Sequence, residues 1–281
     1  CMIGCPCACP YDSYISIPQI HKSNDKPCEN DSIIDCLMNL PLLYWASEEI
    51  GDDRFKRIAM AHADMAIMDH LREDGSVVHI VEHDRETATV RATHAGQGCA
   101  VGSSWSRGQA WGLYGFTMCY RYTKNPEYLA HAENIAEFLL NHPNMPEDLV
   151  PYWDHDVKEF GEPMGEEYMQ KYGHLRDASS AAITASALYE LYWITKKDLY
   201  KEKADKMIES LSTDAYRAPQ GTNGGFIFKH SVGSLPHSFL NIQAGKTRAH
   251  NIDVPLNYAD YYFLEALLRK GRVEKGENPI K

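Results

Sequence analysis

Apolar and polar residues follow a repeated plan along the chain, in which two helical patterns are joined by a short polar turn. Three such turns, at 47–55, 121–128 and 193–200, each end on an aromatic residue that starts the next helix. These aromatics, Phe55, Tyr128 and Tyr200, are 73 and 72 residues apart. A regular spacing of this length indicates a repeated helical hairpin.

The two helices of each hairpin differ in pattern. The stretches before the turns, 37–46, 110–120 and 181–192, are apolar nearly all round, as expected of helices buried on both sides. After each turn, apolar residues recur at steps of three and four, which predicts an outer, half-buried helix. The segment 261–268 predicts a lone final helix, and 75–100 and 221–228 carry turn or short-strand signals.

Alternating buried and half-buried helices, joined by short turns at one end and long loops at the other, predict an all-α fold of the α/α-barrel type. Three hairpins and one helix are too few to close such a barrel, so we expect it to be incomplete at the N-terminus. We expect the barrel over 31–281 and an irregular segment over 1–30. Sites usually lie in the long connections.

Charge and apolar run length exclude two classes of partner. The 281 residues carry a formal net charge of -11 and no basic cluster that tracks a phosphate backbone, so we expect no nucleic-acid partner. No apolar run approaches the roughly 20 residues of a membrane span, so we expect no membrane partner. The sequence does not specify an oligomeric state.

The eight cysteines fall into two groups. Four crowd the N-terminus without a nearby His or paired C-x-x-C, so we predict no metal there: Cys1, Cys5, Cys7 and Cys9. The others are scattered among apolar or small residues, as buried reduced thiols are, which predicts a cytoplasmic location.

Asp35 stands among aliphatic residues at the expected start of a buried helix. One interpretation is a helix N-cap. The other is a carboxylic acid placed to deliver a proton. A similar choice applies to Asp177, which precedes Ser179 and Ser180 and for which we favour helix capping.

Two tryptophans, Trp105 and Trp111, flank Arg107 at the mouth of the second buried helix. Tryptophan faces stack on sugar rings and a guanidinium pairs with a carboxylate, so the group suits an anionic sugar. His79 and His94 lie in the long loop that leads to the same place.

The remaining histidines carry less information. His62, His70 and His131 are expected on helix surfaces, and no H-E-x-x-H or equivalent metal spacing occurs.

Five ordered motifs carry a resemblance to a known family: IDCLMNLPLL at 34–43, WSRGQAWGLYGF at 105–116, VPYWD at 150–154, RDASSA at 176–181 and DYYFLEALLR at 260–269. Together they resemble the unsaturated glucuronyl hydrolases, glycoside hydrolase family 88. The resemblance implies an (α/α)6 barrel, no cofactor and no metal. It also implies removal of the Δ4,5-unsaturated uronic acid from the non-reducing end of glycosaminoglycan oligosaccharides left by lyases.

In the chemistry that this family implies, one Asp protonates C4 of the C4=C5 enol ether and then activates the water that adds to C5. The hemiketal opens and expels the aglycone. By motif match Asp35 is that group, in a catalytic domain over 31–281. The substrate-binding residues by the same match are His79, Gln97, Trp105, Arg107 and Trp111.

The chain departs from the family pattern in two places. The family's T-H-Q-G reads Thr93-His94-Ala95-Gly96-Gln97 here, so Gln97 replaces the expected Gln only if the loop shifts by two residues. Nothing before Asp35 matches the family's H-H-D-x-G-F segment, which carries a second pocket Asp, and the family's N-terminal third has no counterpart.

Two alternatives remain open. The family 105 unsaturated rhamnogalacturonyl hydrolases share the enol-ether hydration but act on pectin fragments, and the motifs around Asp35 and Arg107 favour family 88 over them. The second alternative is an inactive, sugar-binding fragment. In an acidic chain, Arg107 and His79 need help to attract an anionic sugar, and Lys246 and Arg248 in the late loop are candidates.

Overall fold

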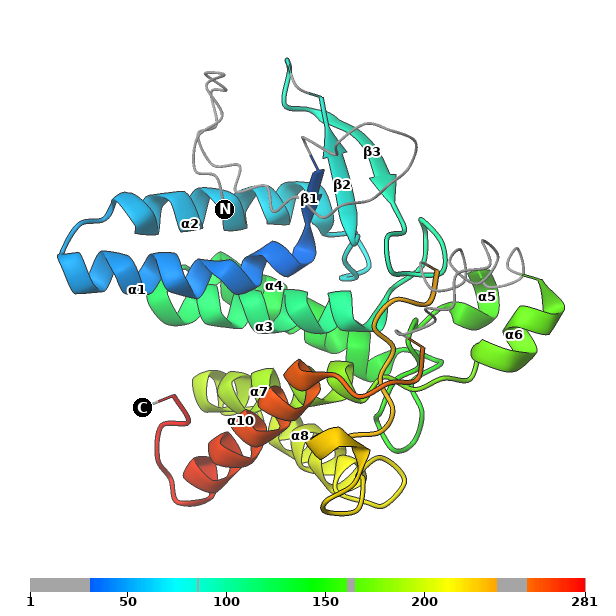
Figure 1. Cartoon of the computed structure of the whole chain (residues 1–281). Helices are drawn as coiled ribbons and strands as arrows, with labels where there is room; N and C mark the ends of the chain where they lie inside the picture. The colour runs from blue at the N-terminus through cyan, green and yellow to red at the C-terminus, as the bar shows by residue number, and fades with distance from the viewer. Residues whose placement is uncertain (1–30, 85, 161–164, 237–251, 281) are drawn as a thin grey trace.

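The chain is built from helical hairpins, as the repeat predicts (Figure 1). The computed structural model describes residues 31–84, 86–160, 165–236 and 252–280. Its hairpins are α1 (Leu40–Ile50) with α2 (Arg54–His70), α3 (Ser106–Thr123) with α4 (Pro126–Asn141), and α7 (Ala178–Thr195) with α8 (Asp198–Leu211); α10 (Asn257–Glu274) follows them.

The three short turns share one backbone device. The residue after each inner helix, Gly51, Lys124 or Lys196, has left-handed backbone geometry with φ of 65°, 59° and 60°. Its N–H donates to the carbonyl four residues earlier, which closes the helix. These positions repeat at the spacing of the aromatics, so the hairpin repeat extends to the backbone.

Helices α3 and α7 form the centre of the described structure. Residues 106–119 of α3 and 178–191 of α7 are all buried. Helix α3 packs on α4 and α7, and α7 packs on α8 and α10, while α1 pairs with α2. The arrangement of inner helices α1, α3, α7 and α10 with outer helices α2, α4 and α8 confirms the all-α, α/α-barrel prediction.

A small antiparallel sheet ties the start of the first inner helix to a distant loop. Its strands are β1 (Asp31–Ile33), β2 (Ile80–His83) and β3 (Val90–His94), in the order β1-β2-β3. β1 continues directly into the 3-10 helix η1 (Ile34–Asn39), which leads into α1. Short elements in the other long connections are α5 (Val157–Phe160), α6 (Glu166–Tyr172) and η3 (Asn223–Gly225).

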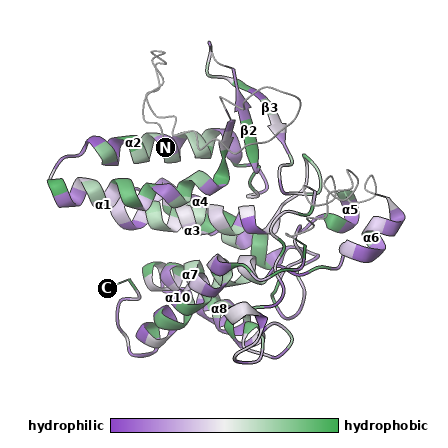
Figure 2. Cartoon of the chain, in the orientation of Figure 1, coloured by the Kyte–Doolittle hydropathy of each residue, from purple (hydrophilic) through white to green (hydrophobic). Residues whose placement is uncertain are grey.

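The first and last inner helices, α1 and α10, expose apolar side chains. Helix α1 was expected to be buried on both sides, but Leu42 and Trp45 are 65% and 53% exposed because α2, η1 and α3 cover only its other face. On α10, Tyr261, Leu264 and Leu268 are at least 54% exposed. We call these five residues the apolar edges; Figure 2 shows hydrophobic residues along both helices.

Two histidines overturn an expectation. His62 and His70 on α2 were expected at the surface, but they are 2% and 1% exposed. Both lie on the inward stripe of α2 that also carries Ala59, Ala63 and Ala66. His131 on α4 is half-buried.

A buried charge network joins the inner helices toward their C-terminal ends. Arg121 on α3 donates to both carboxylate oxygens of Glu190 on α7, each at 2.7 Å. Arg269 on α10 lies 3.2 Å from Glu190 and 3.4 Å from Glu265. Glu190 and Arg269 side chains are each 3% exposed, so each depends on its partners for compensation of its charge.

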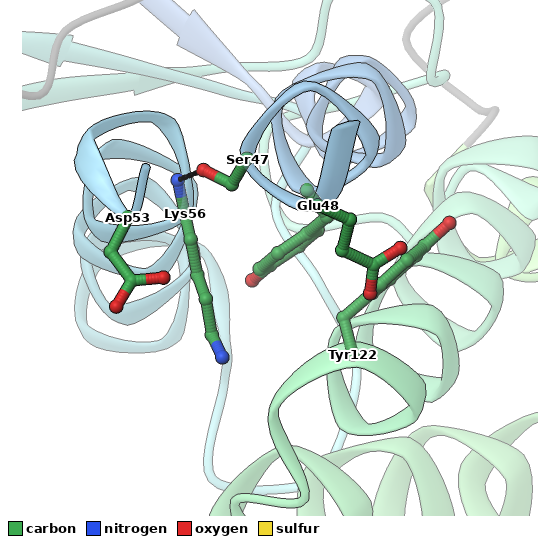
Figure 3. A pocket seen from close by; sticks show the side chains of 6 residues that line it. Ser47, Glu48, Asp53, Lys56 and Tyr122 are labelled. Atoms are coloured by element: carbon green, nitrogen blue, oxygen red, sulfur yellow. Dashed lines mark hydrogen bonds between the residues drawn. The ribbon is translucent and has the colours of Figure 1, made fainter. Parts of the chain in front are cut away.

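A small cavity of about 80 Å³ lies at the same end, beside the first hairpin turn (Figure 3). Its lining residues are Tyr44, Ser47, Glu48, Asp53, Lys56 and Tyr122. The N–H of Lys56 donates to Ser47 Oγ at 2.7 Å, and the rings of Tyr44 and Tyr122 stack at 4.8 Å. Asp35 precedes the opposite end of α1, so this cavity is separate from the candidate site.

Within the described ranges, none of the helices has the length and hydropathy needed to cross a bilayer.

Candidate active site

Asp35 lies where the small sheet turns into the first inner helix. It is the second residue of η1, and Ile33 occupies the N-cap position, so the capping interpretation of Asp35 is wrong. The N–H of the preceding residue, Ile34, donates to the carbonyl of His79 at 3.1 Å. Ile34 is fully buried, whereas 23% of the Asp35 side chain is exposed. The carboxyl therefore lies at the boundary between core and solvent.

His79 faces Asp35 from the start of β2. Its Nε2 lies 3.5 Å from Oδ2 of Asp35. The backbone N–H of Gln97 donates to His79 Nδ1 at 2.9 Å, and the carbonyl of Ala95 lies 3.2 Å from the same nitrogen. Asp35 Oδ2 and His79 Nε2 are both buried, and neither has a hydrogen-bond partner in the described structure. Two buried polar atoms without hydrogen-bond partners thus lie 3.5 Å apart.

The loop that reaches His79 depends on a glycine. Gly96 has φ of +59°, and a Cβ there would lie 2.2 Å from Nδ1 of His79. The next residue, Gln97, also accepts a hydrogen bond at Oε1 from Arg107 Nη2, at 2.8 Å. The loop therefore places Gln97 between His79 and Arg107.

Trp105 joins the histidine to the arginine. Its ring centroid lies 4.2 Å from that of His79, and the guanidinium carbon of Arg107 lies 4.6 Å from the Trp105 ring. Gly108 permits this stack, because a Cβ there would lie 2.7 Å from the indole. The order along the site is thus Asp35, His79, Trp105 and Arg107.

Arg107 is a buried hub with several internal partners. Its Nη1 donates at 2.7 Å both to Oδ2 of Asp177 and to the carbonyl of Val232. Its Nη2 donates to Gln97 Oε1 and, at 2.6 Å, to the carbonyl of Gly233. These four bonds use the four hydrogens of the two terminal nitrogens. Arg107 thereby fixes three separate loops around the site.

Asp177 has a structural role that the sequence predicted and a contact that it did not. Its Oδ1 accepts from the N–H groups of Ser179 at 3.0 Å and Ser180 at 3.4 Å, which caps α7. Its other oxygen pairs with Arg107, and both side chains are at most 3% exposed. The sequence signal for the contact between Asp177 and Arg107 was that each residue lies at the start of an inner helix.

Trp111 lies one turn deeper on α3 and is 8% exposed. Its ring centroid lies 5.3 Å from that of Tyr262 and 6.2 Å from that of Tyr258. Tyr258 also contacts Arg107, whose guanidinium carbon is 5.4 Å from its ring. Burial raises the pKa of Tyr258, and the carboxylates of Asp177 and Asp35 add to the effect. Sequence analysis missed Tyr258, although it is an aromatic at the start of an inner helix.

Asp154, within the VPYWD motif, anchors the loop that follows Gln97. It is fully buried and accepts from the N–H of Cys99 at 2.9 Å, from Ser103 Oγ at 2.7 Å and from the N–H of Asp156 at 2.9 Å. Burial raises the pKa of Asp154, while these donors oppose the rise. Its carboxyl is therefore committed to holding the loop.

Two further polar residues that the sequence brought near the site have partners of their own. Gln109 is buried and bonds both backbone groups of Val77, at 2.8 Å and 2.9 Å. His94 pairs with Glu82 at 2.9 Å on the exposed surface of the β-hairpin.

Several residues singled out by the sequence patterns fall outside the described residues: Lys246, Arg248, the four N-terminal cysteines and the irregular segment 1–30. Within the described residues, His, Cys, Asp and Glu form no group of three or more that could hold a metal ion.

The comparisons with known proteins agree with the motifs. No protein-family model matches the chain. Over 238 residues it is 41% identical to an unsaturated glucuronyl hydrolase of Formosa agariphila, covering 85% of this chain and 54% of the relative. An unsaturated glucuronyl hydrolase of Bacillus sp. GL1 is 36% identical, covering 85% and 58%. An unsaturated chondroitin disaccharide hydrolase of Streptococcus pyogenes is 34% identical, covering 84% and 54%.

Solved structures give the same result. The crystal structure of an unsaturated glucuronyl hydrolase specific for heparin matches with a TM-score of 0.77 at 41% identity, covering 89% of this chain and 62% of that one. The structure of a mutant unsaturated glucuronyl hydrolase from Streptococcus agalactiae, complexed with dGlcA-GalNAc6S, matches with a TM-score of 0.66 at 30% identity. The match covers 84% of this chain and 58% of that one. The chain spans a little over half the length of the curated relatives it matches. Over that span it is similar to the unsaturated glucuronyl hydrolases, which is consistent with a member of glycoside hydrolase family 88.

Proposed function

We propose that residues 31–281 form the acid–base part of a glycosidase that hydrates the C4=C5 enol ether of a Δ4,5-unsaturated uronic acid. The substrate is the non-reducing end of a glycosaminoglycan oligosaccharide left by a lyase. The reaction needs one group that is first an acid and then a base, unlike displacement at the anomeric carbon by two carboxylates.

Asp35 is the proposed acid–base. Its carboxyl group gives a proton to C4, and the positive charge that forms at C5 is shared with the ring oxygen. Water then adds to C5 and returns a proton to the Asp35 carboxylate. The resulting hemiketal opens and expels the aglycone, so the carboxyl group ends the cycle as it began.

One observation carries this assignment. Asp154 and Asp177, the other buried carboxylates near the site, each accept at least three hydrogen bonds. Asp35 Oδ2 accepts none in the described structure, although it is buried 3.5 Å from His79 Nε2. The oxygens of Asp154 and Asp177 are therefore committed to internal donors, whereas Oδ2 of Asp35 is available to a substrate.

We assign substrate binding to His79, Gln97, Trp105, Arg107 and Trp111. The adjoining Trp105 indole and His79 imidazole, whose planes are tilted by 34°, suit contact with a sugar ring. The guanidinium of Arg107 supplies the positive charge for the uronate, which would replace the carbonyls of Val232 and Gly233 as its partners.

The match covers 54% of the first relative's length, and the expected second Asp has no counterpart before Asp35. We therefore expect slower turnover from this chain alone than from a full-length relative. A cytoplasmic location is part of the proposal, supported by the free thiols of Cys99 and Cys119.

The test is to incubate the chain with an unsaturated chondroitin disaccharide and follow the ultraviolet absorbance of the conjugated double bond. We expect the absorbance to fall, and to fall more slowly with an unsaturated rhamnogalacturonan disaccharide. Faster loss with the pectin fragment would instead place the chain with the rhamnogalacturonyl hydrolases. Saturable binding of the chondroitin disaccharide without any loss of absorbance would identify a sugar-binding fragment and overturn the proposal.

A further inference from the structure

His70 is a buried histidine at the C-terminal end of α2, and both of its ring nitrogens are bonded. Nδ1 lies 2.9 Å from the carbonyl of Val78, and Nε2 lies 2.9 Å from Oγ of Ser32. His70 is 1% exposed and Ser32 is 3% exposed. Water therefore does not compete for these two bonds.

The partners fix the protonation state of the ring. A carbonyl only accepts hydrogen bonds, so Nδ1 carries the proton and donates to Val78. Nε2 is then an acceptor, and the hydroxyl of Ser32 donates to it. Burial, against the opposing effect of the bond to Val78 and with the help of the neighbouring His62, His79 and His83, lowers the pKa of His70 to about 4. The ring is thus neutral near neutral pH and satisfied at both nitrogens.

The two bonds reach the two segments that carry the candidate acid and its histidine neighbour. Ser32 lies in β1, three residues before Asp35, and Val78 directly precedes His79. The backbone adds two contacts: the N–H of Val78 donates to the carbonyl of His70 at 2.7 Å, and the N–H of Ile34 donates to the carbonyl of His79 at 3.1 Å. His70 therefore connects β1 and the 77–79 segment.

The strand pairing between β1 and β2 is too short to fix Asp35 by itself. β1 pairs with β2 over only three positions, Asp31↔Glu82, Ser32↔Val81 and Ile33↔Ile80. The pairing ends where η1 begins, so Asp35 itself has no strand partner. A short ladder at the edge of a sheet frays readily, and a rigid side-chain clasp from α2 opposes this.

We propose that His70 is a positioning residue, which clasps Ser32 and Val78 and so holds Asp35 at its distance from His79. Its catalytic consequence rests on the proposed function; its structural consequence does not. A displacement of about 1 Å in a catalytic group costs on the order of a hundredfold in rate, so loss of the clasp acts on kcat more than on KM.

Three variants separate the two arms of the clasp. His70→Leu removes both bonds, His70→Asn keeps a donor near the Nδ1 position, and Ser32→Ala removes only the hydroxyl. We expect kcat to fall by about ten- to a hundredfold in His70→Leu and less in the other two, with KM changed less than about threefold. Ile208→Val on α8, buried and remote from the sheet, serves as the control for lost stability.

Amide hydrogen exchange tests the clasp without any substrate. In Ser32→Ala we expect the Ile34 amide to exchange about two- to tenfold faster, with the buried Leu188 amide of α7 unchanged. If the wild-type chain shows no turnover, the proposed function fails while this exchange result still decides the clasp. An unchanged rate of exchange at the Ile34 amide in both Ser32→Ala and His70→Asn would overturn the clasp. A loss of kcat in His70→Leu no larger than that in Ile208→Val, at equal melting temperature, would also overturn it.

Discussion

Replacement of Arg107 by alanine is expected to destabilise the fold and to disable the site together. The substitution removes a buried ion pair with Asp177, in which Nη1 and Oδ2 are 2.7 Å apart and both side chains are at most 3% exposed. It also removes the donors to Gln97, Val232 and Gly233. Removal of one partner of a buried pair typically costs about 3–5 kcal/mol, because the other charge stays buried.

Here Asp177 keeps its bonds from the N–H groups of Ser179 and Ser180, so we expect about 3 kcal/mol, the lower end of that range. Urea unfolding of Arg107→Ala measures this loss. Lys206→Ala is the control: Lys206 is half exposed and 3.6 Å from Glu209, and such a surface pair is worth at most about 1 kcal/mol.

The same two variants test the site. We expect kcat/KM for the unsaturated disaccharide to fall far more in Arg107→Ala than in Lys206→Ala. Arg107→Lys keeps the charge but not the planar fork, so it should recover only part of the loss. Equal effects of Arg107→Ala and Lys206→Ala on unfolding and on turnover would refute the role of Arg107 as a hub.

Three further outcomes are expected. Glu190→Ala removes the shared partner of Arg269, which is buried, and of Arg121, whose side chain is 22% exposed. It should lower the free energy of unfolding in urea by about 3–5 kcal/mol, and Glu190→Gln should lower it less; equal losses would contradict this. Burial lowers the pKa of His155 from 6.5 to about 3, so the unfolded state binds more protons between these pH values and the free energy of unfolding falls as the pH falls. Between pH 7 and pH 5, the free energy of unfolding of His155→Phe should therefore fall by about 2 kcal/mol less than that of wild type. Parallel pH curves for the two proteins would count against this. Trp45→Ser with Leu264→Ser should reduce self-association in sedimentation velocity, because both side chains are more than half exposed on the apolar edges; unchanged sedimentation would show that these edges do not drive association.

The hairpins could be predicted because they depend on local pattern. The apolar stretch, the polar turn and the following aromatic are all encoded within about 30 residues, as helix periodicity and turn chemistry are. The left-handed positions at Gly51, Lys124 and Lys196 repeat with the same spacing. Local sequence therefore sufficed for the all-α class and for the order of inner and outer helices.

The burial of His70 could not be read from residue type, because histidine is neither consistently buried nor consistently exposed. A signal was present in the helix pattern: His62, Ala66 and His70 follow one another at four-residue steps on the inward stripe of α2. What permits burial is the presence of two polar partners, and Ser32 lies 38 residues away. Such partners are set by tertiary packing.

The partners of Arg107 were hidden for the same reason. The motif predicted a guanidinium between two tryptophans, and the structure places it against Trp105. Asp177 and the carbonyls of Val232 and Gly233 come from 70 to 126 residues further along the chain. Only the fold could show that this guanidinium is occupied by several internal acceptors.

The central claim is that Asp35 gives a proton to C4 of the unsaturated sugar. The most direct measurement is the rate at which Asp35→Asn consumes an unsaturated chondroitin disaccharide, compared with wild type under saturating substrate. General acid–base groups contribute about 10²–10⁴-fold to rate, so we predict a loss of that size with the disaccharide still bound. An Asp35→Asn protein that turns over the disaccharide at the wild-type rate would contradict the claim.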